Sequence, residues 1–342
     1  ISRLAAYSRQ TGLGIRPHTK THKSSRVASM QLEAGAIGLT VAKVGEAAVM
    51  VELCDDLLMA YPAVDLDRAK QLAALAQKTT VHLAIDSARA LEVAAAGAQS
   101  EQATVGLLVD IDAGLGRTGL QTPQEALALA QAIDSTAGVR LDGIMVYPGH
   151  IWLAADQQGP ALAKVAALLE ETLELWKRSG LEAGIVSAGS TPTAYQSHFV
   201  PQFTEIRPGT YVYNDMNTVH GGYCELADCA ARLVCTVMST AVPGQIVIDA
   251  GSKTLTSDRC VSSSEGGFGH IVEYPQARIV RLSEEHGQVD VTTCDRAPVV
   301  GERVTVIPNH ICPCVNLHDA VWWHEPGQPL ERLPIDARGR IT

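Results

Sequence analysis

Short apolar runs alternate with longer amphipathic segments along the first two thirds of the chain. The segments between the runs are rich in alanine and leucine at helical spacing, and glycine or proline stands at the joins. Eight runs have the character of buried strands: residues 15–18, 36–42, 56–62, 80–86, 105–112, 141–149, 184–190 and 205–212. Eight strand units joined mostly by helices predict a (β/α)₈ TIM-type barrel over residues 1–220. An open doubly wound sheet is the alternative, because the number of strands does not show closure.

The pattern changes after about residue 222, where β-branched runs dominate and helical stretches are few. Glycine and proline separate these runs, which lie at residues 231–242, 244–252, 277–291 and 303–317. We therefore predict a mostly antiparallel β domain over residues 221–342. The first residues look like the middle and end of an amphipathic helix without an N-cap, so we expect a natural strand ahead of residue 1.

Composition narrows the class of protein. The chain has 342 residues, 46% of them hydrophobic, and a formal net charge of −10. The acidic balance argues against nucleic-acid binding, and no apolar run is long enough for a membrane helix or resembles a signal peptide. Eight cysteines are sparse for this length, and we expect free thiols. These features predict a soluble, cytoplasmic globular protein.

Polar side chains follow the predicted barrel strands at the end where barrel enzymes hold their active sites. Lys20 stands after the first strand in "RPHTKTHKS", where burial would favour the neutral amine that Schiff-base chemistry needs. The alternative is a surface lysine in a charged loop. We expect His22 and Lys23 to be cations that keep this amine neutral or that meet solvent, and His18 has no assigned role.

Two hydroxyl-rich turns follow the last two strands, "SAGSTPT" at 187–193 and "RPGTY" at 207–211. Barrels commonly bind phosphate there through backbone N–H groups and hydroxyls, although plain turn chemistry would also explain them. An imine-forming lysine opposite a phosphate site is the arrangement of a pyridoxal-phosphate enzyme. In "VDIDAGLGRTG", Arg117 would stabilise the cofactor's phenolate oxygen, or would only hold Asp112 in an ion pair.

The β domain contains a candidate metal pair in "PNHICPCVNLHD", residues 308–319. A structural zinc site normally takes four protein ligands in paired spacings, and no second pair is present. His310 and Cys312, two apart on a segment that we expect to be extended, would point to one face and leave positions open for water and substrate. Packing of a buried cysteine beside a histidine is the alternative.

Together these motifs resemble the D-threonine aldolase and D-serine dehydratase family, metal-activated pyridoxal 5'-phosphate enzymes with the alanine-racemase-type (fold type III) barrel. The likeness covers almost the whole chain, since "DAGSKTLTSD", "GFGH" and "EEHG" match stretches of the family's C-terminal domain. The resemblance implies that Lys20 forms the imine with the cofactor and that His310 and Cys312 bind the metal. The residues implied in cofactor binding are Arg117, Gly189, Ser190, Thr191, Gly209, Thr210 and Tyr211.

The segment "VYPGH" at 146–150 departs from both groups of the family. From their place at the end of the sixth strand, we assign Tyr147 to cofactor binding and His150 to proton transfer.

The family divides by chemistry. The H-x-C pair and "VSAGSTPTA" resemble dehydratases of D-serine or D-3-hydroxyaspartate, whereas "HTKTHKS" and "VNLHD" resemble aldolases. We predict a dehydratase that converts a D-3-hydroxy amino acid to a 2-oxo acid and ammonia. The alternative is an aldolase that releases glycine and an aldehyde, with His150 as a candidate base. A thiolate ligand favours zinc, and an aldolase would favour Mn²⁺ or Mg²⁺.

Two further functions are compatible with the barrel and its cofactor. One is an amino-acid racemase, which needs no metal. The other is a non-catalytic cofactor carrier, but the β domain with its metal pair argues against that function. The resemblance also implies a homodimer.

Overall fold

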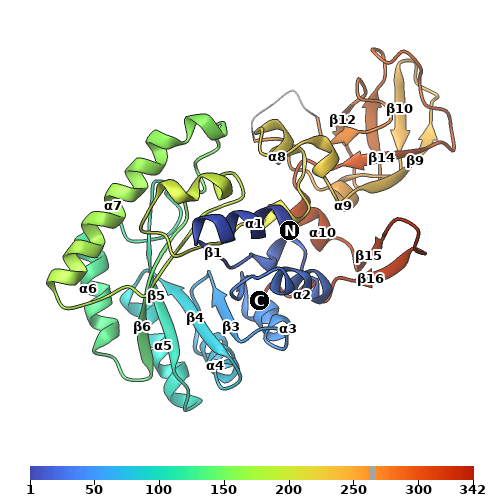
Figure 1. The fold of residues 1–342 in the computed structure, drawn as a ribbon. Coiled ribbons are helices and arrows are strands. Elements are labelled where there is room, and N and C mark those ends of the chain that lie inside the picture. The colour runs from blue at the N-terminus through green and yellow to red at the C-terminus, as the bar shows by residue number, and fades with distance from the viewer. Residues whose placement is uncertain (262–266) are drawn as a thin grey trace. The chain divides into compact units, whose positions relative to one another are not determined.

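The computed structural model describes residues 1–261 and 267–342. The chain divides into two compact units, one of residues 1–209 with 339–342 and the other of residues 210–338 (Figure 1). Across both described stretches, no helix has the length and apolar character that a membrane span requires.

The first unit is a barrel of eight parallel strands. Its strands are Gly14–Ile15 (β1), Leu39–Val41 (β2), Asp56–Met59 (β3), Thr80–Ile85 (β4), Val105–Ile111 (β5), Val139–Val146 (β6), Ile185–Ala188 (β7) and Glu205–Ile206 (β8). They are ordered β1-β8-β7-β6-β5-β4-β3-β2. All seven residues of β5 are buried, as expected for a parallel strand with both faces covered.

Backbone contacts between the segment after β1 and the start of β2 close the barrel. The N–H of Ile37 donates to the carbonyl of Ile15, and that of Thr40 to Pro17, both at 2.9 Å. His18 and Thr40 form a parallel bridge at the same seam. The predicted barrel is therefore confirmed, and the open sheet is excluded.

Helices cover the outside of the strands (Figure 1). The α-helices of this unit are Ser2–Thr11 (α1), Ser25–Glu33 (α2), Val44–Met50 (α3), Leu66–Leu75 (α4), Ala88–Ser100 (α5), Pro123–Asp134 (α6) and Gly159–Arg178 (α7). Its 3₁₀ turns are Thr19–Thr21 (η1), Ala155–Gln157 (η2) and Ala194–Phe199 (η3). Side-chain caps start several helices; at α6 the Thr122 hydroxyl and the Glu125 carboxylate form a reciprocal capping box, which satisfies backbone N–H groups at the helix N-terminus.

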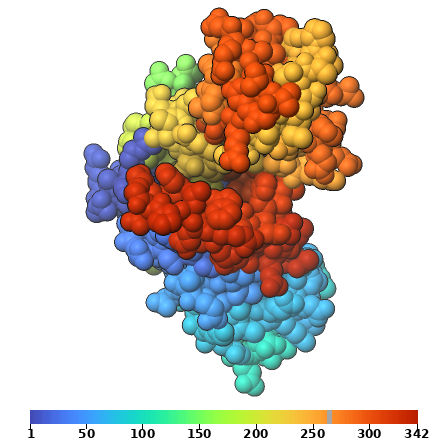
Figure 2. Space-filling model, turned by 90° about the vertical axis from the view of Figure 1, so that its right-hand side faces the viewer, coloured from blue at the N-terminus to red at the C-terminus, as the bar shows by residue number. Residues whose placement is uncertain are grey.

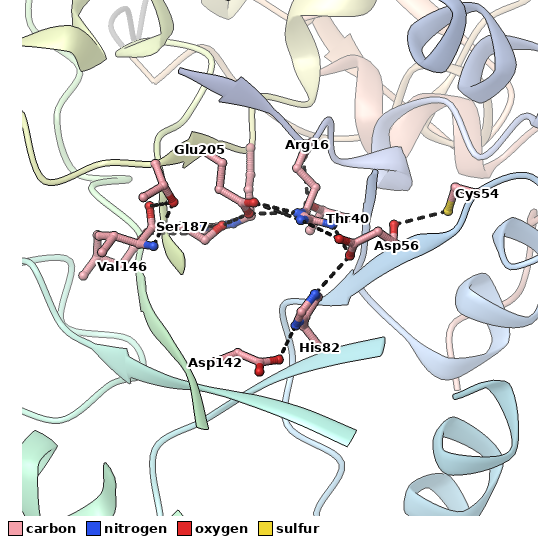
Figure 3. Close-up of polar contacts among 12 residues, drawn as sticks. Arg16, Thr40, Cys54, Asp56, His82, Asp142, Val146, Ser187 and Glu205 are labelled. Carbon is pink, nitrogen blue, oxygen red and sulfur yellow. Dashed lines mark hydrogen bonds and ion pairs between the residues drawn. The ribbon is translucent and has the colours of Figure 1, made fainter. Parts of the chain in front are cut away.

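A layer of paired charges lies inside the barrel (Figure 3). Arg16, which is 2% exposed, donates to Glu205 at 2.8 Å and to Asp56 at 2.6 Å. His82 lies between two carboxylates, with Nε2 3.1 Å from Asp56 and Nδ1 2.5 Å from Asp142. Each buried charge has an opposite charge beside it, because an unpaired buried charge is strongly destabilising. The layer joins residues from five different parts of the barrel.

The second unit is built on a six-stranded antiparallel sheet ordered β11-β14-β9-β10-β13-β12, with a separate β15–β16 hairpin. Its strands are Leu233–Ser239 (β9), Gln245–Ile248 (β10), His270–Ile271 (β11), Arg278–Leu282 (β12), Gly287–Asp290 (β13), Arg303–Ile307 (β14), Ala320–Trp323 (β15) and Glu331–Pro334 (β16). Its helices are Thr210–Val212 (η4), Met216–His220 (α8), Leu226–Asp228 (η5), Ser252–Leu255 (α9) and Ile311–Asn316 (α10). In this sheet, β9 and β10 lie between β14 and β13. The space-filling view of Figure 2 shows gold residues of this unit beside orange residues from later in the chain.

Alternating apolar residues on the strands of this sheet form the core of the second unit. Val237, Ile248, Ile279, Val289 and Val304 are at most 1% exposed. The predicted antiparallel β domain is confirmed.

The charged layer predicts a pH-dependent stability. Burial alone would lower the pKa of His82, but the carboxylates of Asp142 and Asp56 raise it to about 8, above its ordinary value of 6.5. This shift corresponds to about 2 kcal/mol of stabilisation. Because the folded-state pKa is the higher one, the contribution is complete below pH 6.5 and is lost as the pH rises through 8. The free energy of unfolding in urea, measured at pH 6 to 9, should therefore fall by about this amount as the pH rises.

The matched variants are His82→Asn, in which this pH-dependent step should disappear, and His286→Asn on the exposed surface, which should keep it. An equal step in wild type and His82→Asn would contradict the assignment.

Candidate active site

Lys20 lies in the 3₁₀ turn η1 at the C-terminal end of β1. Its side chain is exposed and not buried as we expected from the sequence, whereas the flanking Thr19 and Thr21 are 0% exposed and fix the turn. Gly209, after β8, packs against this turn: a Cβ there would lie 2.8 Å from the Thr21 hydroxyl oxygen and 3.2 Å from the His18 carbonyl oxygen. The amine is therefore presented beside the turn that follows the last strand.

His22 is not the cation that we expected. The ring is 0% exposed, and the N–H of Ser24 donates to its Nδ1 at 3.1 Å, so Nε2 carries the proton and faces the Gln31 amide oxygen at 3.1 Å. Burial lowers the pKa of His22 to about 4, and the ring is neutral at physiological pH. The expectation was wrong because the segment turns inward after Lys20.

Two neighbours of Lys20 are also buried. Lys23 is 6% exposed, and its charge favours the ionised form of Glu46, although burial raises the pKa of that carboxyl. His18 is 9% exposed, and burial together with the positive charges of Lys20 and Arg207 holds its pKa well below 6.5. His18 therefore stays neutral beside Lys20.

Arg117 and Tyr147 come together from the loops after β5 and β6. Asp112 accepts hydrogen bonds from the backbone N–H groups of residues 114–116, at 2.9 to 3.1 Å. Arg117 instead lies over the ring of Tyr147, with its guanidinium carbon 5.0 Å from the ring centre. Backbone hydrogen bonds thus hold this loop, in place of the Asp112–Arg117 ion pair that was the alternative.

His150 lies beside the same loop. Its side chain is exposed, and its ring would be 3.2 Å from a Cβ placed on Gly114. The structure thus brings three predicted site residues, Arg117, Tyr147 and His150, to two adjacent loops. The base role of His150 stays a prediction.

The turn after β7 is shaped by glycine and hydroxyl groups. Gly189 has φ of +79°, and a Cβ there would lie 2.8 Å from Ile206, so a larger residue would clash with β8. The N–H of Ser190 donates to the hydroxyl of Thr193 at 3.2 Å, and the two hydroxyls lie 3.1 Å apart. Thr191 follows and is half-buried. Small residues and ordered hydroxyls suit a phosphate group at this turn.

Sequence reasoning missed Arg207, which lies in the interior below these turns. It is 5% exposed and donates to the Ser187 hydroxyl at 2.7 Å and to the Val146 carbonyl at 2.9 Å. Ser187 in turn donates to Glu205 at 2.5 Å (Figure 3). Burial lowers the pKa of Arg207 to about 10, although Glu205 and Asp110 favour its charged form. The sequence did contain a signal for Arg207. Glu205 and Arg207 are two positions apart in the predicted strand 205–212, and charged side chains in a buried barrel strand have to be paired inside the protein.

Asp110 is a second buried charge at this end of the barrel. Burial raises its pKa to about 6, while the Thr118 hydroxyl, 2.9 Å away, and the Arg207 charge oppose the rise. Its position near the C-terminal end of a fully buried strand was visible in the sequence, but its raised pKa was not.

The candidate metal pair lies at the end of β14. His310 precedes helix α10, and Cys312 is inside it, so the expected extended segment was wrong for Cys312. The side chains of His310 and Cys312 are nevertheless hydrogen-bonded, because the helix begins directly after His310. Burial would lower the pKa of His310, but Cys312 and Asp258 raise it to about 9. Thr210, predicted at the phosphate, has its hydroxyl 3.5 Å from the Cys312 sulfur, and Tyr211 follows it in η4.

The donor sets fit both groups that the sequence implies. An exposed amine beside the glycine turn after β8, with a second glycine turn after the neighbouring strand β7, suits pyridoxal phosphate. A nitrogen and a sulfur donor in contact suit a divalent metal, and the described residues gather no set of three or more His, Cys, Asp or Glu around a metal position. Two protein ligands would leave coordination positions for substrate and water.

Comparison with known proteins agrees with this geometry. Residues 1–217 match the alanine racemase N-terminal domain, and residues 230–323 match a putative serine dehydratase domain. The chain belongs to the alanine racemase N-terminal domain family. Within it, the chain is similar to a D-threonine aldolase of Arthrobacter sp, with 27% identity over 98% of this chain and 88% of that protein. It is also similar to a D-threo-3-hydroxyaspartate dehydratase of Delftia sp. (strain HT23), with 29% identity over 91% and 87%.

Solved structures of the family have the same fold. A D-threonine aldolase from Filomicrobium marinum aligns with a TM-score of 0.90 and 26% identity, covering 100% of this chain and 92% of its own. A cysteine-to-alanine variant of D-threo-3-hydroxyaspartate dehydratase, in the metal-free form, aligns with a TM-score of 0.88 and 25% identity, over 97% and 93%. These relatives, aldolases and dehydratases, are pyridoxal-phosphate-dependent lyases.

The hydrogen bond from Arg207 gives a test of this part of the family barrel. In Ser187→Ala, one N–H of the buried Arg207 loses its acceptor, which should lower the free energy of unfolding by about 1–3 kcal/mol. Ser135→Ala, at the exposed end of α6, should have little effect. Urea unfolding of both variants checks this, and equal stabilities would show that Ser187 does not hold Arg207.

Proposed function

We propose that the chain is a pyridoxal-phosphate- and metal-dependent lyase that dehydrates a D-3-hydroxy amino acid, namely D-serine, D-threonine or D-3-hydroxyaspartate, to a 2-oxo acid and ammonia. The observation that carries the dehydratase choice is the contact of His310 with Cys312 at the start of α10. The similar dehydratase supports it: the histidine and the cysteine that are replaced in two of its structures also stand two positions apart.

We further propose that the metal is zinc. A cysteine thiolate is a soft ligand, and together with imidazole it favours zinc over Mg²⁺ or Mn²⁺. The metal would act as a Lewis acid on the 3-hydroxyl of the substrate, with His310 and Cys312 as its protein ligands.

Residues of the barrel would hold the cofactor and move the proton. Bound pyridoxal phosphate supplies an electron sink for the negative charge left at the α-carbon. Lys20 would be the base for the α-proton, since its side chain projects from the turn at the end of β1, beside the glycine turn that follows β8. The turns at Gly189 and Gly209 would bind the phosphate, and Arg117 would lie beside the ring together with Tyr147.

Aldol cleavage is the second candidate. Its support is the exposed imidazole of His150 beside the β5 loop, where it could take the hydroxyl proton of the substrate, and the similarity to D-threonine aldolases over 98–100% of the chain. With aldol cleavage, the metal would be Mn²⁺ or Mg²⁺. With either reaction, we propose a homodimer, as the family resemblance implies, and a cytoplasmic location, as the composition of the sequence suggests.

Product analysis separates the reactions. The holoprotein is incubated with D-serine, D-threonine and D-3-hydroxyaspartate, and we expect ammonia with pyruvate, 2-oxobutyrate or oxaloacetate from at least one of them. Glycine with an aldehyde would establish the aldolase instead. Activity that survives chelation and only inverts the α-carbon would establish a racemase, and no turnover of any substrate would favour a cofactor carrier.

Lys20→Ala should abolish the visible absorbance of the bound cofactor, because the amine that holds it covalently is removed. Lys78→Ala is the matched control, since Lys78 is exposed and paired with Glu52 before β4. Absorbance spectra of the two purified proteins check this. An unchanged spectrum in Lys20→Ala would refute the assignment of the cofactor lysine.

A further inference from the structure

Asp258 fixes the orientation of the His310 ring. Its Oδ2 lies 2.7 Å from Nδ1 of His310. An ionised carboxylate only accepts hydrogen bonds, so Nδ1 of the neutral ring carries the proton. The lone pair is therefore on Nε2, and that nitrogen is the one able to bind a metal.

The position of Asp258 depends on the residue next to His310. Asn309 is 2% exposed, and its side-chain amide donates to the carbonyl of Asp258 at 3.0 Å and to that of Gly267 at 2.9 Å. The N–H of Asp258 donates to the Thr256 hydroxyl at 3.2 Å. The carboxylate is thus tied to the same strand end as the imidazole that it orients.

The backbone between the two proposed ligands is also held. Asp215 is 0% exposed and accepts a hydrogen bond from the N–H of Ile311 at 3.0 Å. Ile311 separates His310 from Cys312, so this bond fixes where helix α10 begins. Asp258 therefore orients the His310 ring, and Asp215 holds the backbone at Ile311.

We propose that Asp258 is a positioning residue for the metal: it directs Nε2 of His310 toward an ion shared with Cys312, and it does not itself bind that ion. This inference rests on the proposed function, because it takes His310 and Cys312 as the metal ligands. Removing a carboxylate that orients a metal-binding histidine typically weakens metal affinity by roughly 10–100-fold.

The experiment is a titration of the metal-depleted, cofactor-loaded protein with Zn²⁺, in competition with a chromophoric chelator. We expect Asp258→Ala to bind Zn²⁺ roughly 10–100-fold more weakly than wild type. In Asp258→Asn, the amide oxygen still accepts from Nδ1, so affinity should return to within about threefold of wild type. Asp319→Ala is the control, because Asp319 is exposed and pairs with Arg338.

The outcomes are distinct. Equal Zn²⁺ affinity in wild type, His310→Ala and Cys312→Ala would refute the metal pair of the proposed function. If those two variants lose affinity while Asp258→Ala does not, only the positioning role is wrong. A loss as large in Asp258→Asn as in Asp258→Ala would show that the carboxylate charge binds the metal, and would also overturn the inference. Thermal unfolding checks each variant, and Asp258→Ser replaces the alanine variant if that one does not fold.

Discussion

The structure of the barrel depends on the need to pair charges inside it. Glu205 is 2% exposed and joins two parts of the interior: it accepts from Arg16, after β1, and from Ser187 in β7. Because a buried carboxylate without partners is strongly destabilising, these contacts fix how the first and last strands meet. β1 and β8 are neighbours in the sheet, so the pairing acts close to the seam where the barrel closes.

The same pairing extends toward the strand ends that carry the candidate cofactor site. The Ser187 hydroxyl donates a hydrogen bond to Glu205, so its oxygen is free to accept a hydrogen bond from Arg207. Arg207 cannot move without leaving an N–H unsatisfied, and its charge acts on Asp110 and His18. Burial and the charge of Arg207 together thus set the protonation of His18, which lies beside Lys20, while the same charge opposes the rise in the pKa of Asp110. Preorganised charges of this kind need no rearrangement during a reaction.

Much of the fold was predictable because it follows from local pattern. Eight buried runs separated by helices predicted the barrel, and every predicted strand overlaps an observed one, although β1 and β6 begin before the predicted ranges. Closure was not predictable, since it depends on backbone contacts between residues 15–17 and 37–40 that no local pattern encodes. Site residues at strand ends, such as Lys20, were accessible by position. Glu205 and Asp258 were missed because their roles come from partners distant in sequence, and His22 was misjudged because a charged-looking segment turned inward.

In the proposed function, the choice between dehydration and aldol cleavage depends on the ligands of the proposed metal. If Cys312 is a ligand, its soft, strongly donating sulfur would favour zinc, and that ion would still withdraw electrons from a hydroxyl group that has to leave. A carboxylate in place of Cys312 would favour a harder ion such as Mg²⁺, which keeps several bound waters. Such a site suits removal of the proton from the substrate's 3-hydroxyl group. The pairing of the Cys312 thiol with His310 was predicted from the sequence, but the helix that begins between the two residues, at Ile311, was not. That contact makes carbon–oxygen cleavage the better-supported reaction.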